Sequence, residues 1–102
     1  MRKPDDGYLT DAQLLKAIHK HLAEDRYRVT KHADAELKND NLDLLDVVHV
    51  LKTGKHDHSK TGLDTHRQIW KYAIEGRIED ARKIRVIIAF IEEMLIITVM
   101  EL

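Results

Sequence analysis

IRVIIAFIEEMLIITVM, residues 84–100, carries the strongest structural signal in this chain. Its two runs, 84–91 and 94–100, are rich in β-branched residues and apolar at nearly every position, which is typical of strands covered on both faces. Glu92 and Glu93 separate the runs and are expected to form a hairpin turn, although they lack the Asn-Gly or Asp-Gly chemistry of the strongest turns. The same two charges leave the segment short of a membrane span.

An alternating segment precedes this hairpin. In residues 68–75 (QIWKYAIE), Trp70, Tyr72 and Ile74 fall on one face, which predicts a strand with one side against a core. Residues 55–61 could add an edge strand. The second half of the chain therefore predicts an antiparallel sheet of three to four strands.

The first half has the spacing of helices instead. Thr10 and Gln13 fit the capping-box pattern, and the helix after them carries one apolar stripe. Thr30 can cap a second helix. A third helix ends at Gly54, a residue suited to a left-handed C-terminal cap.

Together these signals describe one α+β domain with its helices packed mainly on one face of the sheet. The chain has 102 residues, too few for two domains with separate cores. We expect residues 1–9 to form a flexible lead, residues 10–54 to be mainly helical, and residues 55–102 to form the antiparallel sheet.

Composition excludes several classes of protein. Apolar residues make up 43% and charged residues 34%, as in a soluble globular protein, and there is no cysteine for disulfides or thiolate metal sites. The N-terminus lacks the apolar segment of a secretory signal, so we expect a cytoplasmic protein with no membrane partner. There is no Gly-rich phosphate loop, nucleophile elbow or HExxH motif, so no cofactor is expected.

Charge is spread unevenly along the chain. The net charge of −1 argues against strong, non-specific binding of nucleic acid. Residues 52–85 nevertheless hold nine Lys and Arg against five Asp and Glu, which indicates either a phosphate-facing region or a solvated sheet edge. Arg67, Lys71 and Arg85 are the candidates for binding phosphate, and pairing with neighbouring carboxylates explains Arg85 equally well.

His32 is the candidate acid–base group. At the first turn of a helix the free amides disfavour an imidazolium and attract phosphate, and a neutral imidazole is what a general base requires. The alternative is a local hydrogen-bonding role at the helix start. Thr98 is the polar residue of the last apolar run, and its hydroxyl either bonds to backbone or is offered to a ligand.

A cluster of histidines raises the question of a metal. His56 and His58 would share one face of an extended strand, and His66 follows eight residues later. Two histidines without a third ligand in place are a weak signal for zinc or nickel, so we expect no metal site here and interpret these residues as part of a mobile loop.

Four segments together resemble a known pattern: VTKHADAEL (29–37), NLDLLDVVHVLKTGK (41–55), IWKYAIEG (69–76) and KIRVIIAFIEEMLIITV (83–99). Over about residues 26–101 the chain is similar to the domain-of-unknown-function 4258 family, whose members often begin with Ser/Thr-x-His-Ala and end with an Ile-Thr-Val-like strand. That family has been grouped with small metal-independent ribonucleases of the barnase–RelE type, including toxin domains. The resemblance implies the same order of helices and then antiparallel sheet.

Thr30, His32 and Ala33 match the opening motif, and Thr98 matches the closing one. The resemblance thus implies catalytic roles for His32 and Thr98 and a substrate-binding role for Thr30.

The chain also departs from the family pattern. Glu36 stands where the family usually has Arg, and Asp40 and Asn41 replace a second basic residue and a Gly. An acidic residue in place of a cation would weaken phosphate binding.

Three functions remain open at this point. The first is a metal-independent, toxin-type ribonuclease, or a diverged inactive relative, with RNA as substrate and a cognate antitoxin as partner. The second is a non-catalytic protein- or nucleic-acid-binding module on the same fold, which Glu36, Asp40 and the near-zero net charge favour. The third is a metal-binding protein that uses His56, His58 and His66.

Overall fold

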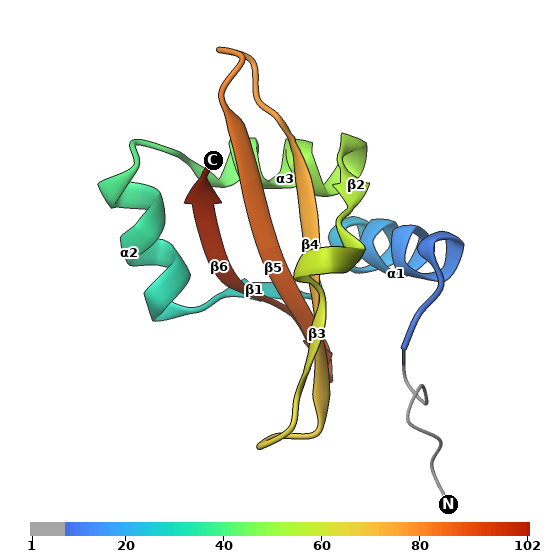
Figure 1. Ribbon diagram of the computed structural model, residues 1–102. Coiled ribbons are helices and arrows are strands. Elements are labelled where there is room, and N and C mark those ends of the chain that lie inside the picture. The colour runs from blue at the N-terminus through green and yellow to red at the C-terminus, as the bar shows by residue number, and fades with distance from the viewer. Residues whose placement is uncertain (1–7) are drawn as a thin grey trace, which may run out of the picture.

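Three α-helices and a six-stranded sheet make up residues 8–102, the part of the chain that the computed structural model describes (Figure 1). In chain order the elements are α1 (Asp11–Ala23), β1 (Tyr27–Val29), α2 (Lys31–Asn39), α3 (Leu44–Thr53), β2 (Lys55–His56), the 3-10 helix η1 (His58–Lys60), β3 (Gly62–Asp64), β4 (Ile69–Arg77), β5 (Lys83–Ile91) and β6 (Glu93–Glu101). The α+β class is confirmed. The sheet has more strands than the three to four expected because β1, β2 and β3 add short ones of two or three residues.

The strands follow the order β1-β6-β5-β4-β2, and β3 pairs with β4 outside this path. The three long strands β4, β5 and β6 are antiparallel neighbours, as the sequence predicts. The hairpin of β5 and β6 turns at Glu92, which has a positive φ of 63°. The guanidinium of Arg26 donates to the Glu92 carbonyl at 2.9 Å. The short strand β1 joins the far edge in parallel, with Tyr27 opposite Met94.

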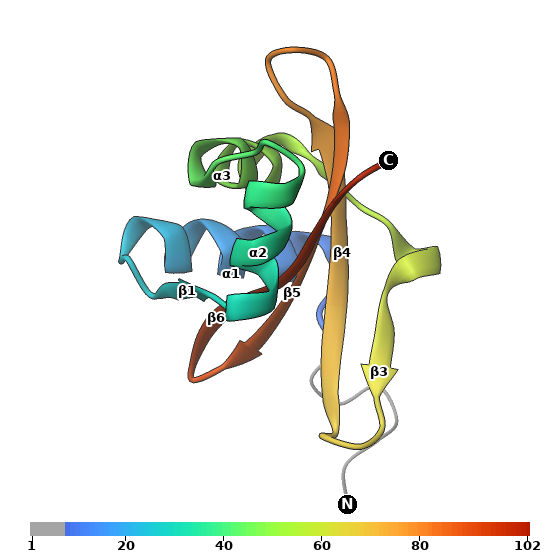
Figure 2. The same cartoon turned by 90° about the vertical axis from the view of Figure 1, so that its left-hand side faces the viewer.

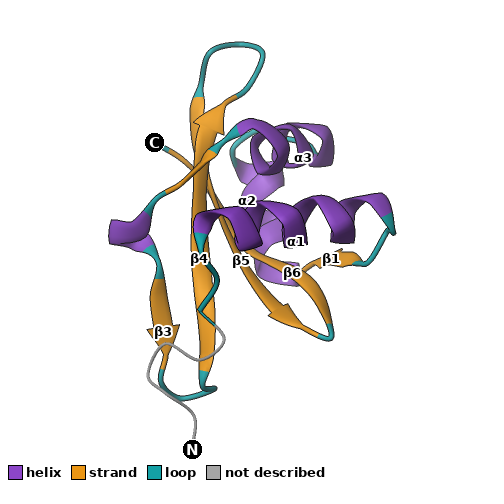
Figure 3. Cartoon of the chain, turned by 90° about the vertical axis from the view of Figure 1, so that its right-hand side faces the viewer, coloured by secondary structure: helices purple, strands orange, loops and turns teal. Residues whose placement is uncertain are grey.

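The three α-helices lie on one side of the long strands (Figures 2 and 3). Alternate residues of β5 point to that side, and Ile84, Val86 and Ile88 are fully buried there. Arg85 and Ile87, which lie between them in sequence, are only half-buried. The expectation that the helices pack mainly on one face is confirmed. The expected cover on both faces is partial, since the second face of β5 carries no α-helix within residues 8–102.

Both predicted helix caps form. Thr10 and Gln13 exchange the two hydrogen bonds of a capping box, at 2.9 and 3.2 Å. The Thr30 hydroxyl accepts from the Ala33 amide at 3.2 Å. The longest helix, α1, has 13 residues, and within residues 8–102 no helix has the length and apolar character needed to cross a membrane.

The expected lead, residues 1–9, falls mostly outside the described part of the chain, which excludes residues 1–7. Its last two residues, Tyr8 and Leu9, pack against the hydrophobic core. The Leu9 amide also donates to the Tyr72 hydroxyl at 2.9 Å, so the backbone just before α1 is tied to β4.

Gly54 ends α3, but in a way that the sequence did not predict. Its backbone is extended, with φ −78° and ψ −179°, rather than left-handed. The glycine is needed because α3 approaches β4 very closely here. A Cβ at this position would lie 2.5 Å from the Glu75 carbonyl oxygen and 2.6 Å from that of Val50.

Replacing Gly54 with Ala is therefore expected to destabilise the fold. The clash is with backbone atoms, which cannot rotate away, and overpacking of this kind costs about 1–3 kcal/mol. Chemical denaturation of Gly54→Ala beside Gly62→Ala tests this, because a Cβ at Gly62 meets no atom within 4 Å. Equal free energies of unfolding in the two variants would contradict the close approach.

Candidate functional site

The free edge of β6 is where the sequence-predicted catalytic residues lie. Strand β1 pairs with β6 only as far as Ile96, and α2 takes over from there. The Thr30 amide donates to the Ile96 carbonyl at 3.0 Å. The Thr30 hydroxyl donates to the Ile97 carbonyl at 3.2 Å while it caps α2. Because the hydroxyl proton of Thr30 is donated within the protein, a structural role is enough to explain why a threonine stands here.

The Glu36 side chain also bonds to the backbone at this edge of β6. One of its carboxylate oxygens, Oε1, accepts from the Val99 amide at 2.9 Å. The other, Oε2, lies 3.4 Å from Nε2 of His32, one turn earlier on α2. The acidic residue that departs from the family pattern thus anchors α2 to β6 and lies beside the imidazole of His32.

The His32 side chain is 68% exposed, so a large substrate can reach it. Thr98 is half-buried and directly precedes Val99 in β6. The register slips next to it, since Ile88 pairs with Ile96 but Ile87 pairs with Thr98. His32 is thus on α2, beside Glu36, and Thr98 is in β6, next to the Val99 amide that Glu36 binds, but no hydrogen bond joins His32 and Thr98 within residues 8–102.

The predicted phosphate-binding cations are not gathered around His32. Arg85 lies on β5 and bonds through Nε to the Glu75 carboxylate at 2.6 Å. Lys71, on β4, lies 3.4 Å from the Asp64 carboxylate. Arg67 is in the turn between β3 and β4, and β5 separates β4 from β6. Of the three, only Arg85 is on a strand next to β6.

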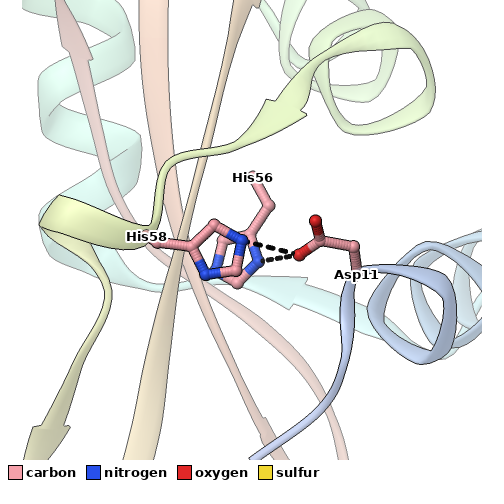
Figure 4. Close-up of side chains that lie close together, drawn as sticks. All are labelled: Asp11, His56 and His58. Carbon is pink, nitrogen blue, oxygen red and sulfur yellow. Dashed lines mark hydrogen bonds and ion pairs between the residues drawn. The ribbon is translucent and has the colours of Figure 1, made fainter.

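A second cluster joins the start of α1 to the segment after α3. One carboxylate oxygen of Asp11 lies 2.8 Å from Nδ1 of His56 and 2.8 Å from Nε2 of His58 (Figure 4). The two imidazole rings are 4.0 Å apart between centroids. His66 is not part of this cluster, because it lies in the turn after β3, where its amide donates to Asp64.

Asp11 is the residue that sequence reasoning missed. Nothing local connects a helix-start aspartate with a histidine 45 residues later. The hydrogen bond from His56 is the main cause that lowers the pKa of Asp11 below its usual value. The His56 ring is almost completely buried, with a side-chain exposure of 4%.

A hollow of about 480 Å³ opens beside the histidines, and Lys55, Lys83 and Asp57 are among the residues that line it. The Asp57 carboxylate accepts from the backbone amide of Ser59 at 2.9 Å and from its hydroxyl at 2.7 Å. The hydroxyl bond is the largest of the effects that lower the pKa of Asp57 to about 2.

This pKa gives a prediction for acid pH. A carboxyl group whose pKa is lower in the folded state stabilises the fold above its unfolded pKa, near 3.8, and the stabilisation is lost as the pH falls towards about 2. We expect an NMR titration of the Asp57 carboxyl carbon to give a midpoint near 2, and Ser59→Ala to move this midpoint upward. A midpoint at the ordinary value in the wild type would contradict the assigned hydrogen bonds.

Comparison with known proteins finds a family match to the part of the chain from the end of β1 onward. No curated protein and no solved structure matches the chain. A family described as a domain of unknown function, DUF4258, matches residues 29–101, which run from β1 to the last residue of β6. Helix α1, with Asp11, precedes the matched segment, while His32, Thr98, His56 and His58 lie inside it. The chain belongs to the DUF4258 family.

Proposed function

We propose that this protein is a ribonuclease-like domain of the toxin type that needs no metal, with His32 as its acid–base group. The observation that carries the proposal is the pairing of an exposed imidazole with a fixed carboxylate. Glu36 is held by the Val99 amide, and its second oxygen lies 3.4 Å from Nε2 of His32. A carboxylate held in this way orients an imidazole and stabilises the imidazolium that forms during proton transfer.

The reaction that suits this pair is cleavage of RNA by transesterification. His32 takes the proton from a ribose 2′-hydroxyl as the 2′-oxygen attacks phosphorus. The bond from phosphorus to the 5′-oxygen breaks, and the 5′-oxygen receives a proton from the imidazolium. The products are a 2′,3′-cyclic phosphate and a 5′-hydroxyl, and no metal or other co-reactant is needed.

Thr98 and Arg85 have supporting roles in this proposal. The Thr98 hydroxyl would donate to a phosphoryl oxygen, and Arg85, on the neighbouring strand, would approach the developing negative charge if it exchanged Glu75 for the phosphate. Thr30 would act by fixing the start of α2. RNA is then the substrate, an antitoxin the expected protein partner, and the cytoplasm the expected location.

A non-catalytic protein- or nucleic-acid-binding module on the same fold is the second candidate. The observation that favours it is the pairing of the cations, since Lys71 and Arg85 already have carboxylate partners in Asp64 and Glu75. A diverged member that had lost activity would keep its scaffold and its exposed surfaces.

Incubation of labelled single-stranded RNA with purified protein in EDTA tests the first candidate. We expect cleavage that ends in a 2′,3′-cyclic phosphate and a rate lower by about 10²- to 10⁴-fold in His32→Ala, the usual contribution of general acid–base catalysis. Glu36→Gln keeps an acceptor for the Val99 amide but loses the charge, so it should slow cleavage less. His19→Ala, which alters an exposed histidine on α1, is the matched control and should cleave normally.

Two results would overturn this proposal. Equal cleavage by the wild type and His32→Ala would remove His32 from the reaction. RNA or protein binding without cleavage, by protein that is folded, would support the second candidate instead.

A further inference from the structure

Proton positions in the Asp11 cluster decide which ring nitrogens have a lone pair free for an ion. The key residue is Thr61, whose hydroxyl lies 3.0 Å from the Asp57 carbonyl oxygen and 2.8 Å from Nε2 of His56. The same hydroxyl accepts from the Ala73 amide at 3.0 Å. A hydroxyl has one proton to give, and a carbonyl has none. The Asp57 carbonyl also accepts from the Lys60 amide at 3.2 Å. When the Thr61 proton goes to this carbonyl, the proton between Thr61 and His56 is on Nε2 of the ring.

That arrangement is one of two tautomers of a neutral His56; in the other, Thr61 donates to Nε2 and Nδ1 donates to Asp11. A neutral imidazole with its proton on Nε2 has a lone pair on Nδ1. That lone pair faces the Asp11 carboxylate oxygen at 2.8 Å, which is also an acceptor. Two acceptors at this distance repel each other unless something positive lies between them. Either a second ring proton or a metal ion satisfies the contact.

His58 can also present a lone pair to Asp11. Its Nδ1 lies 3.1 Å from the Tyr8 hydroxyl, which can accept a proton from the ring as well as donate one. With the proton on Nδ1, the lone pair of Nε2 also points at the Asp11 oxygen, 2.8 Å away.

We infer that Asp11, His56 and His58 form a binding site for a divalent transition-metal ion of the zinc type. Their ligand atoms, two imidazole nitrogens and one carboxylate oxygen, all lie within 4.8 Å of one another. This donor set suits zinc and is poor for Mg²⁺ or Ca²⁺, which prefer oxygen alone. Asp11 and His58 are 67% and 56% exposed, so a fourth position remains open to water.

The fit requires only small movements. Around a tetrahedral zinc ion with bonds of about 2.0–2.1 Å, neighbouring ligand atoms are about 3.3 Å apart. The 2.8 Å contacts would have to open by about half an ångström, and the exposed side chains of Asp11 and His58 are free to provide this. His56 stays fixed, because Thr61 holds its other nitrogen in the manner of the outer-shell partners that orient metal-bound histidines.

The site would also join two parts of the chain. Asp11 is the first residue of α1, before the segment that matches the family, while both histidines are within it. A bound ion would bridge α1 to the segment that connects α3 with the sheet. The site lies apart from the α2–β6 edge and plays no part in the proposed RNA chemistry.

Calorimetric titration of EDTA-treated, dialysed protein with zinc chloride tests the inference, with histidine-ring NMR of the same samples. We expect one ion per chain, with shifts in the ring signals of His56 and His58. Asp11→Asn and His58→Ala each remove a ligand, so affinity should fall by more than the roughly tenfold cost of losing an outer-shell partner. His66→Ala, another exposed histidine, is the matched control and should bind zinc like the wild type.

The inference fails if no binding heat is measured, or if Asp11→Asn and His58→Ala keep the affinity of the wild type. It also fails if zinc shifts only the rings of the other histidines, since the ion would then be adventitious. Circular dichroism and thermal unfolding of the metal-free variants show whether each keeps its fold, which separates loss of a ligand from loss of the fold.

Discussion

The edge of β6 is the constraint on which the N-terminal half of the domain depends. The strand has nine residues, but β1 pairs with only three of them. A buried amide or carbonyl left without a partner costs about 1–3 kcal/mol, and an open edge invites pairing with another chain. The side chains of Thr30 and Glu36 act in place of a neighbouring strand, since they bond to Ile97 and Val99. This fixes α2 along the edge, and with it the position of His32.

Local rules predicted what depends on local chemistry. The hairpin of β5 and β6 follows from two apolar runs, and the caps at Thr10 and Thr30 follow from side chains that bond to amides three residues away. Gly54 was correctly predicted to end a helix, but the predicted left-handed backbone conformation was wrong. The reason for that glycine is the carbonyl of Glu75, on a strand that no local pattern connects to α3.

The candidate site was harder to predict for the same reason. By the family resemblance, Glu36 was interpreted as the loss of an Arg that would bind phosphate. In the fold its partner is a backbone amide 63 residues away. His56 and His58 were recognised as neighbours, but their third partner, Asp11, comes from a helix that is brought to them only by tertiary packing. The basic excess of residues 52–85 was also misleading as a sign of free charge. In the folded chain much of it faces carboxylates in the same region, such as Asp64, Glu75 and Asp80.

The position of β6 in the chain has a consequence for synthesis. The partners of β1 and of the start of α2 are 67 residues further along, in the last strand of residues 8–102. Contacts of such long range form slowly, and here they cannot begin until the C-terminal strand has emerged. Until then β5 and the helices that should cover it have no complete core to join. Until β6 has been made, the domain therefore stays in a state that chaperones and proteases can recognise, and a chain that stops before residue 94 lacks the strand to which β1 and α2 attach.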